Sequence, residues 1–338
     1  MARNKQLPKH LLVFRTSAMG DVAMLPHALR ALCAAYPELK VTVATQAMFK
    51  PFFRGLEVDF LEVKVKAEHH SAAGIWSLAR EARRLGVDAV ADVHDVLRSQ
   101  LFDLSMRLHG IRVARIDKGR ADKKHALLSG GDFAPLKHSV VRYCDTFRRL
   151  GFEFEDPSPA VKPVLANPMG EKKGLWIGFA PFSAHAGKTY PEAMQEPLVA
   201  LLAARYDRVF IHGGGGKEQE FAERMEQRFE NVTALFGKVR FAGELEVMSH
   251  EDCLISMDSL AMHMASLVAT PVVSIWGATH PNLGFLGWGC RPEDALQDPL
   301  PCRPCSVFGA KPCQYGDYRC LTGITPERIV AQIEKVVR

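Results

Sequence analysis

Residues 252–277 read DCLISMDSLAMHMASLVATPVVSIWG and alternate between strand-like and helix-like segments. The apolar run 252–257 leads directly into Asp258 and Ser259, and a helix-forming segment follows at once. After a Thr-Pro pair comes a second strand of buried type. This order predicts a strand–helix–strand unit, whose tight first turn directs a helix N-terminus toward an anion.

Polar groups gather at the start of this predicted helix. Ser259 occupies the N-cap position, and Asp258 precedes it at the carboxyl end of the strand. His263 follows Ser259 by four residues, so both lie on one face of the helix. A carboxylate, a hydroxyl, backbone N–H groups and an imidazole together suit a nucleotide diphosphate. The alternative is a capped helix that contains a core histidine.

Apolar strands alternate with helices along the whole chain, which predicts parallel sheets covered on both faces. The pattern stops and restarts across 155–174, a segment with four prolines. We therefore expect an α/β protein with two doubly wound, Rossmann-like domains and a cleft between them, over residues 1–160 and 172–338. The strands are expected near 11–16, 41–46, 60–65, 89–94, 112–117, 175–181, 208–214, 252–257 and 271–276. Helices are expected near 22–36, 74–85, 191–205, 217–229, 259–268 and 326–337.

Two glycine-containing segments resemble nucleotide-binding motifs but do not match them. Gly213 to Gly216 follows a strand, but the third glycine of G-x-G-x-x-G is replaced by Glu218. Gly187 and Lys188 resemble the end of a P-loop, yet its first glycine is absent. The chain therefore carries neither a dehydrogenase fingerprint nor a Walker A loop.

Charge is divided unevenly between the two halves. Residues 1–165 hold 26 Lys and Arg against 18 Asp and Glu, whereas the rest hold 17 against 20. A basic first half suggests an anionic partner, although plain solubility explains it equally well. Nucleic acid is disfavoured, because the basic run 107–124 lacks interleaved aromatics. The cations expected to contact an anionic membrane face, weakly and reversibly, are Arg112, Arg115, Arg120, Lys123 and Lys124.

Four of the eight cysteines cluster near the C-terminus. Cys302, Cys305, Cys313 and Cys320 have the spacing C-x2-C-x7-C-x6-C, which resembles a compact thiolate zinc site. A structural zinc ion is thus one expectation, and free or air-oxidised thiols are the other. No apolar run is long enough to span a bilayer, and no signal peptide is recognised, so the sequence predicts a cytoplasmic protein.

The polar motifs, taken in order, resemble a known family. The segments that carry the resemblance are 14–22 (FRTSAMGDV), 181–188, 213–218 and 258–281. Together they are similar to the ADP-heptose:lipopolysaccharide heptosyltransferases of glycosyltransferase family 9. The resemblance covers nearly the whole chain and implies a GT-B architecture, in which the last helix crosses back toward the first domain.

The resemblance also implies residue roles. Asp21 corresponds to the proposed general base, although by position alone it is a helix-capping acid. Lys188 and Ser183 correspond to the loop that meets the donor diphosphate, and Glu218 lies toward the donor nucleoside. Without the resemblance, Lys188 is a solvated surface lysine and Glu218 an ordinary first-turn acid.

Three further positions complete the expected site. Leu260 stands where the family has a small residue after Asp-Ser, which puts the closest approach of the phosphate in doubt. His94 and Arg98 follow the fourth strand and are expected on the acceptor side, where Arg98 meets a phosphate or carboxylate. The alternative is a helix-starting loop with an exposed arginine.

The expected function is that of an inverting glycosyltransferase that moves a heptose from ADP-heptose to the lipopolysaccharide inner core. No metal cofactor is required for this chemistry. The acceptor is a phosphorylated glycolipid at the cytoplasmic face of the inner membrane. The alternatives are a nucleotide-sugar epimerase of similar build and a non-catalytic nucleotide-binding protein.

Overall fold

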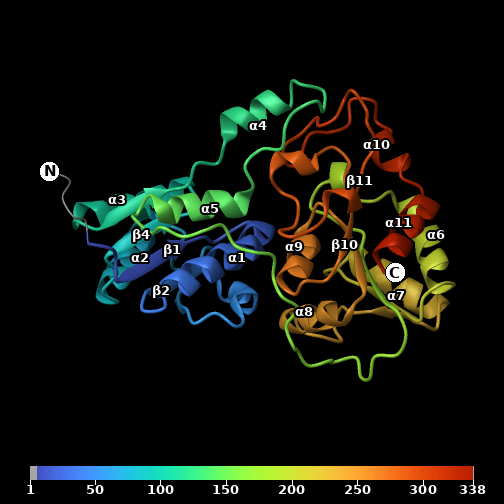
Figure 1. Cartoon of the computed structure of the whole chain (residues 1–338), viewed down its shortest axis with the longest axis horizontal. Helices are drawn as coiled ribbons and strands as arrows, with labels where there is room; N and C mark the ends of the chain where they lie inside the picture. Colours follow the sequence, from blue (N-terminus) through green and yellow to red (C-terminus); the bar gives the residue numbers. More distant parts are fainter. Residues whose placement is uncertain (1–5, 338) are drawn as a thin grey trace. The chain divides into compact units, whose positions relative to one another are not determined.

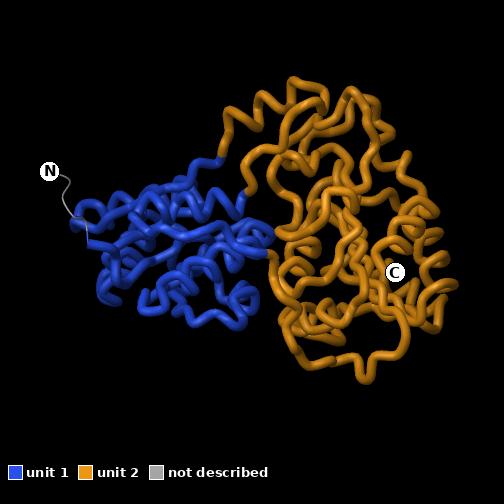
Figure 2. The backbone as a smooth tube through the Cα atoms, viewed as in Figure 1, with its two compact units in different colours: residues 1–118, 139–158 blue, residues 119–138, 159–338 orange. Residues whose placement is uncertain are grey.

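The chain forms two compact units, each built on its own parallel sheet. The structure, a computed structural model, describes residues 6–337. Unit 1 comprises residues 1–118 and 139–158, and unit 2 comprises residues 119–138 and 159–338 (Figure 2). The prediction of an α/β protein with two Rossmann-like domains is therefore confirmed.

Five parallel strands form the sheet of unit 1, in the order β3-β2-β1-β4-β5 (Figure 1). They are β1 (His10–Phe14), β2 (Lys40–Thr45), β3 (Asp59–Glu62), β4 (Ala89–Asp92) and β5 (Arg112–Arg115). Strand β1 pairs with β2 on one side and with β4 on the other, so the strand order reverses between β1 and β4. In open α/β sheets, ligands bind at such a switch point, outside the carboxyl ends of the strands.

Helices cover both faces of this sheet. They are α1 (Met19–Ala35), α2 (Ala72–Arg84), α3 (Leu97–Leu108) and α5 (Ser139–Arg148), with the 3-10 helix η1 (Ala47–Phe53). Helices α1 and α5 contact each other, as do α2 and α3. The core under α2 and α3 joins Leu12 and Phe14 of β1 to Leu78 of α2 and Phe102 of α3. Every residue of β1 is buried, which explains its continuous apolar sequence.

Unit 2 has six parallel strands, in the order β11-β10-β9-β6-β7-β8. They are β6 (Trp176–Ala180), β7 (Arg208–Ile211), β8 (Val232–Ala234), β9 (Cys253–Met257), β10 (Val272–Ile275) and β11 (Ala295–Leu296). Here the order reverses between β6 and β9, which makes these two strands the switch point. The short β8 and β11 were not predicted from the sequence, because each has too few residues to show a pattern.

Two sets of helices sandwich the second sheet. The long ones are α6 (Glu192–Ala203), α7 (Lys217–Arg228), α8 (Phe241–His250), α9 (Leu260–Leu267) and α11 (Pro326–Val336); η2 (Ala186–Lys188), η3 (Pro281–Leu283), η4 (Pro292–Asp294) and α10 (Arg319–Thr322) are short. One core cluster contains residues of α6, α7 and α11, and a smaller one contains Val247 of α8 with Trp176 and Phe210. Helix α11 packs on α6 and β10 within unit 2. Its expected crossing to the first domain stays a prediction.

The segment 119–138 lies between β5 and α5 in the chain but packs in unit 2 (Figure 2). It carries the short helix α4 (Arg120–Ala126). The ammonium of Lys123 lies 4.2 Å from the ring centre of Phe285, and His138 Nε2 lies 2.6 Å from the carbonyl oxygen of Leu286. The sequence-based boundaries place this segment in the first domain. Its contacts with the 280–288 loop explain why the structure groups it with unit 2.

Two residues of the basic run 107–124 are engaged in contacts within their own units. The run is divided between the two units at residue 118. Arg115 forms an ion pair with the buried carboxylate of Asp103, at 2.9 Å, and Lys123 is buried against Phe285. Two of the five cations expected to contact a membrane are therefore committed to internal contacts. Within residues 6–337, no helix combines the length and apolar character needed to span a bilayer.

Candidate functional site

The polar residues predicted in unit 1 meet at its switch point. The loop after β1 carries Thr16 and Ser17, and the loop after β4 carries His94. Thr16 Oγ1 lies 3.3 Å from His94 Nδ1, and Ser17 Oγ lies 3.1 Å from His94 Nε2. Both nitrogens of the imidazole are thus engaged by the first loop. Gln46, after β2, also contacts the first loop, because its side-chain amide donates a hydrogen bond to the carbonyl oxygen of Thr16 at 2.6 Å.

Asp21 lies in the first turn of α1 and is held by a buried arginine. Helix α1 begins at Met19, three residues earlier than predicted, which places Asp21 inside the helix. The Arg15 guanidinium pairs with the Asp21 carboxylate and also donates to the carbonyl oxygen of Val93. Tyr143 of α5 donates to the backbone carbonyl of Asp21 at 3.0 Å. The Asp21 side chain remains 30 % exposed.

The His94 imidazole is buried between the first loop and the sheet. Its ring stacks on Phe14. Burial, and after it the nearby charges of Arg15 and Lys118, lower the pKa of His94 to about 3. The imidazole is therefore uncharged at physiological pH and orients the loop that precedes Asp21. Direct contact of His94 with an acceptor stays a prediction.

Arg98 lies in the first turn of α3, near enough to His94 for its charge to contribute to the lowered pKa of that imidazole. Its side chain is half-buried at the carboxyl edge of the sheet. The loop before it is shaped by Asp92, whose Oδ1 accepts hydrogen bonds from the backbone N–H groups of His94 and Asp95. A contact of Arg98 with an acceptor phosphate or carboxylate stays a prediction.

In unit 2, the switch point holds a buried ion pair. Lys188 Nζ lies 3.2 Å from Asp258 Oδ2, and the two side chains are only 15 % and 8 % exposed. Lys188 ends η2, after β6, and Asp258 follows β9 directly. Because β6 and β9 are adjacent and parallel, their loops meet at one edge. A lysine and an acid that lie 70 residues apart in the chain are thereby brought together.

The start of α9 is less strongly capped than the sequence suggested. Ser259 is the N-cap residue, but its hydroxyl makes no capping hydrogen bond and lies 3.3 Å from Ser256 Oγ. Leu260 is the first helical residue and is half-buried. His263 is buried on α9, close enough to His138 for its charge to help lower the pKa of that histidine, after burial.

Ser183 lies in the loop after β6, and Glu218 lies at the start of α7, which follows β7. The backbone carbonyl of Ser183 accepts a hydrogen bond from Thr189 Oγ1 at 3.2 Å, which ties the ends of the lysine loop together. Glu218, in the first turn of α7, turns back to accept a hydrogen bond from the N–H of Gly214 at 2.6 Å. Its carboxylate therefore orders the glycine-rich loop, and a contact with a nucleoside stays a prediction.

The cysteine-bearing segment braces Lys188. A Cβ on Gly187 would lie 2.9 Å from Ala278 Cβ, and one on Gly309 would overlap the Lys188 stem. The N–H of Ala278 donates to the carbonyl oxygen of Gly187 at 2.8 Å. Close backbone approach at these two glycines thus fixes the aliphatic part of Lys188. Neither glycine was singled out for this role from the sequence.

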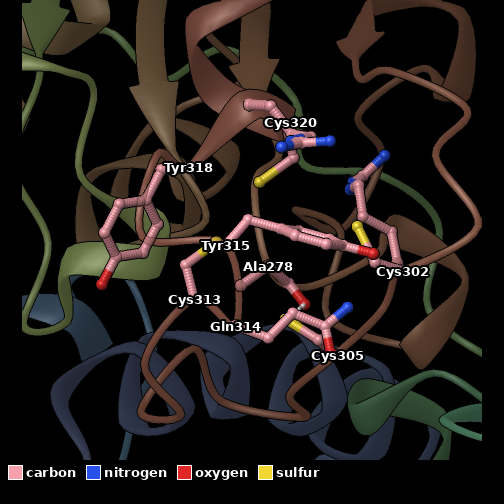
Figure 3. A pocket seen from close by; sticks show the side chains of 10 residues that line it. Ala278, Cys302, Cys305, Cys313, Gln314, Tyr315, Tyr318 and Cys320 are labelled. Carbon is pink, nitrogen blue, oxygen red and sulfur yellow. Dashed lines mark hydrogen bonds between the residues drawn. The ribbon is translucent and has the colours of Figure 1, made fainter.

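All four clustered cysteines line one small pocket, together with Tyr315 and Tyr318 (Figure 3). None of them forms a disulfide. In the part of the chain that the structure describes, no three His, Cys, Asp or Glu side chains are grouped so as to hold a metal ion. The zinc site expected from the spacing is therefore not formed by the side chains as they stand.

A buried charge pair in unit 2 escaped the sequence analysis. His212, after β7, lies 2.7 Å from Glu251 Oε1, and both side chains are almost fully buried. Gly178 in β6 leaves the space for this carboxylate, because a Cβ there would overlap it. Although burial opposes the charged imidazole, Glu251 and Glu244 raise the pKa of His212 to about 10. The one signal of this pair in the sequence was a histidine directly after the strand at 208–211.

Comparison with known proteins gives a consistent assignment. A family model described as glycosyltransferase family 9 (heptosyltransferase) matches residues 75–307. Lipopolysaccharide heptosyltransferase 1 of Pseudomonas aeruginosa is 27% identical over 164 residues, which is 44% of each chain, so this match spans less than half of either protein. Lipooligosaccharide heptosyltransferase 2 of Campylobacter jejuni is 21% identical over 326 residues, covering 94% of this chain and 96% of that protein.

Solved structures share the fold. The E. coli heptosyltransferase WaaC with ADP has a TM-score of 0.70 and 20% identity, covering 96% of this chain and 99% of that one. The family model spans well over half of the chain, and the two Rossmann-like units agree with it. The chain therefore belongs to glycosyltransferase family 9, the heptosyltransferase family.

Proposed function

We propose that this protein is an inverting glycosyltransferase that transfers a heptose from ADP-heptose to a phosphorylated glycolipid, the lipopolysaccharide inner core. The observation that carries the proposal is the placement of Asp21. It is a partly exposed carboxylate at the switch point of unit 1, held by the buried Arg15. The relatives named above support the sugar, and the ADP in the similar solved structure supports the nucleotide.

Asp21 acts as the general base on the acceptor. It accepts the proton of the acceptor hydroxyl as that oxygen forms a bond to the anomeric carbon. The bond from that carbon to the diphosphate oxygen breaks on the opposite face, so the configuration at the anomeric carbon inverts. The loop contacts of Thr16 and Ser17 with neutral His94 keep the approach to Asp21 in one conformation.

The donor diphosphate binds at the switch point of unit 2. It gains negative charge as the bond breaks, and Lys188 together with the N–H groups at the start of α9 stabilises that charge. Asp258, which pairs with Lys188 in the structure, turns toward donor hydroxyls when the diphosphate takes its place. A fixed ammonium and backbone N–H groups supply this stabilisation without a divalent metal. Ser183, Glu218, Ser259, Leu260 and His263 complete the proposed donor site.

An acceptor-dependence experiment separates this function from its two alternatives. Purified protein is incubated with ADP-heptose, with and without lipopolysaccharide core acceptor. ADP released only with acceptor, with a product heavier by one heptose, is the expected result. A changed sugar without acceptor would identify an epimerase, and saturable binding without turnover would identify a nucleotide-binding protein.

Replacing Lys188 by Ala is expected to weaken ADP binding by about 10- to 150-fold, because one charge-assisted contact contributes roughly 1.5–3 kcal/mol. The loss also leaves the Asp258 carboxylate next to the phosphates without its cation. Titration calorimetry measures the change. Lys172→Ala is the matched control, since Lys172 pairs with Asp252 at 2.7 Å near the amino end of β6. Unchanged affinity in the Lys188 variant would remove this residue from the donor site.

The cysteine cluster is a separate proposal with a structural role. From the spacing C-x2-C-x7-C-x6-C and the shared pocket, we propose that the four thiols rearrange to hold one structural zinc ion. Elemental analysis after reducing purification should then find about one ion per chain. Replacing Cys302 and Cys305 by Ser should abolish it. Metal-free wild-type protein would contradict the zinc proposal and leave the transferase reaction unaffected.

The acceptor determines where the enzyme works. A glycolipid acceptor requires the protein to meet a membrane surface. The proposed location is the cytoplasm, with transient contact at the anionic inner face of the inner membrane.

A further inference from the structure

Helix α3 in unit 1 carries a row of four leucines, three of which are exposed. Leu97, Leu104 and Leu108 are 84 %, 50 % and 65 % exposed, and Leu101 between them is partly buried. Successive residues of an α-helix are about 100° apart, so these four leucines fall within about 60° of one another. We call Leu97, Leu101, Leu104 and Leu108 the leucine stripe.

The stripe lies directly opposite the face of α3 that packs on the sheet. Ser99, Phe102, Asp103 and Met106 are fully buried, and by the same helical geometry they centre about 180° from the stripe. A surface helix of a globular protein normally presents polar residues to solvent on this outer face. The outer face of α3 instead presents leucines, which marks it as an interaction surface.

The charges on α3 indicate what this surface meets. Arg98 and Arg107 fall on opposite sides of the stripe. Arg98 lies about 100° around the helix from Leu97, and Arg107 lies about 100° from Leu108. The one acidic residue of the helix, Asp103, is buried and paired with Arg115 at 2.9 Å. The outer face of α3 therefore offers leucines flanked by cations and no carboxylate. Leucines flanked by arginines match the boundary between acyl chains and anionic headgroups.

The position of the stripe relative to the loop of His94 to Val96 also supports a membrane surface as the partner. Leu97 is the first residue of α3 and follows the loop of His94 to Val96, at the sheet edge that carries Asp21. The twelve residues of α3 extend the stripe from that edge over about 18 Å. A glycolipid whose sugar reaches this edge can leave its acyl chains in the bilayer beside the helix.

From these observations we infer that the leucine stripe of α3 is the surface by which the protein rests on an anionic bilayer. This inference deepens the proposed function, because it assigns the contact with the membrane that the glycolipid acceptor requires. It also replaces the basic run 107–124 as the principal contact, since Arg115 and Lys123 of that run are engaged inside the fold. Leucine burial makes part of the binding insensitive to salt, whereas the contribution of the flanking arginines is screened.

The test is co-sedimentation with phosphatidylcholine vesicles prepared with and without phosphatidylglycerol. The double substitution Leu104→Gln and Leu108→Gln is expected to weaken binding to the anionic vesicles by about 10-fold or more, at low and at high salt. Arg107→Gln should weaken it by about five-fold at low salt only. Leu128→Gln is the matched control, because Leu128 is a 78 % exposed leucine of unit 2 and should change nothing.

Two further measurements separate this inference from the proposed function and from folding. All variants should keep the melting temperature and the rate of turnover on a deacylated, water-soluble acceptor. Normal vesicle binding by the double variant, or no binding by the wild type, would overturn the membrane assignment even if turnover is normal. Sedimentation equilibrium tests the other possible partner of the stripe, a second copy of the chain. A wild-type dimer that becomes monomeric in the double variant would assign the stripe to that copy and overturn the inference.

Discussion

Replacing Asp21 by Asn is expected to lower kcat by about 10²–10⁴-fold, because an amide cannot accept the proton of the acceptor hydroxyl. Asn keeps the shape of the side chain, and it still accepts a hydrogen bond from Arg15, so the loop should stay in place. The rate of heptose transfer at saturating donor and acceptor measures the effect. Affinity for ADP, whose proposed site lies in unit 2, should be unchanged.

Controls distinguish a lost base from a lost fold. Asp59→Asn changes an exposed acid of the same unit, whose partner is Lys40 at 3.3 Å, and should leave kcat unchanged. Thermal melting of both variants shows whether the loss of the ion pair with the buried Arg15 affects stability. If Asp21→Asn keeps a rate within a few-fold of the wild type, Asp21 is a helix-capping residue only.

Replacing His212 by Gln is expected to lower the free energy of unfolding by about 3–5 kcal/mol. The substitution leaves the fully buried Glu251 carboxylate without its cation. Urea unfolding, monitored through the tryptophan fluorescence of unit 2, measures the loss. The exposed His125 provides the control, because His125→Gln should be nearly neutral.

The same pair predicts a dependence on pH. Burial opposes the charge, but Glu251 and Glu244 raise the His212 pKa to about 10, above the value of about 6.5 for an unfolded chain. A raised pKa contributes stability that is complete below about pH 6.5 and is lost as the pH rises through the folded pKa. The difference between wild type and His212→Gln should therefore be larger at pH 6 than near pH 10. A difference that does not change with pH would contradict a charged imidazole.

A double substitution tests the coupling directly. Exchanging both His212 and Glu251 for Gln removes both charges, so the double variant should be more stable than the sum of the single effects predicts. Additive losses would show that the two side chains contribute independently, by packing alone.

Much of the fold was predictable because it rests on short-range patterns. The strands β1, β6, β9 and β10 are largely apolar runs, and a parallel sheet buries such runs on both faces. The failures have equally physical causes. The bounds of α1 were wrong by a turn because Met19 and Gly20 carry no helix-starting signal, and β8 and β11 are too short to show a period.

The residues of the candidate site were predictable from the sequence, but the contacts between them were not. Asp21, Lys188 and Asp258 each follow a strand, and parallel strands expose their carboxyl ends at one edge. The sequence did not show that Asp21 is held by Arg15, although an arginine that ends the buried run 10–14 was a visible signal. Nor did it show that both nitrogens of His94 are engaged by the first loop, since those contacts join residues more than 70 positions apart.

The sequence by itself determined the two parallel sheets, the polar residues at their switch points and the family. These properties are local, because each depends on residues within one strand, turn or helix. Only the tertiary structure decided the pairing of Lys188 with Asp258, the burial of His212 against Glu251 and the packing of 119–138 in unit 2. Those features depend on which distant segments the sheets bring together. The exposure of the leucine stripe on α3 belongs with them, because a leucine in a sequence is read as core until the surrounding structure leaves it uncovered.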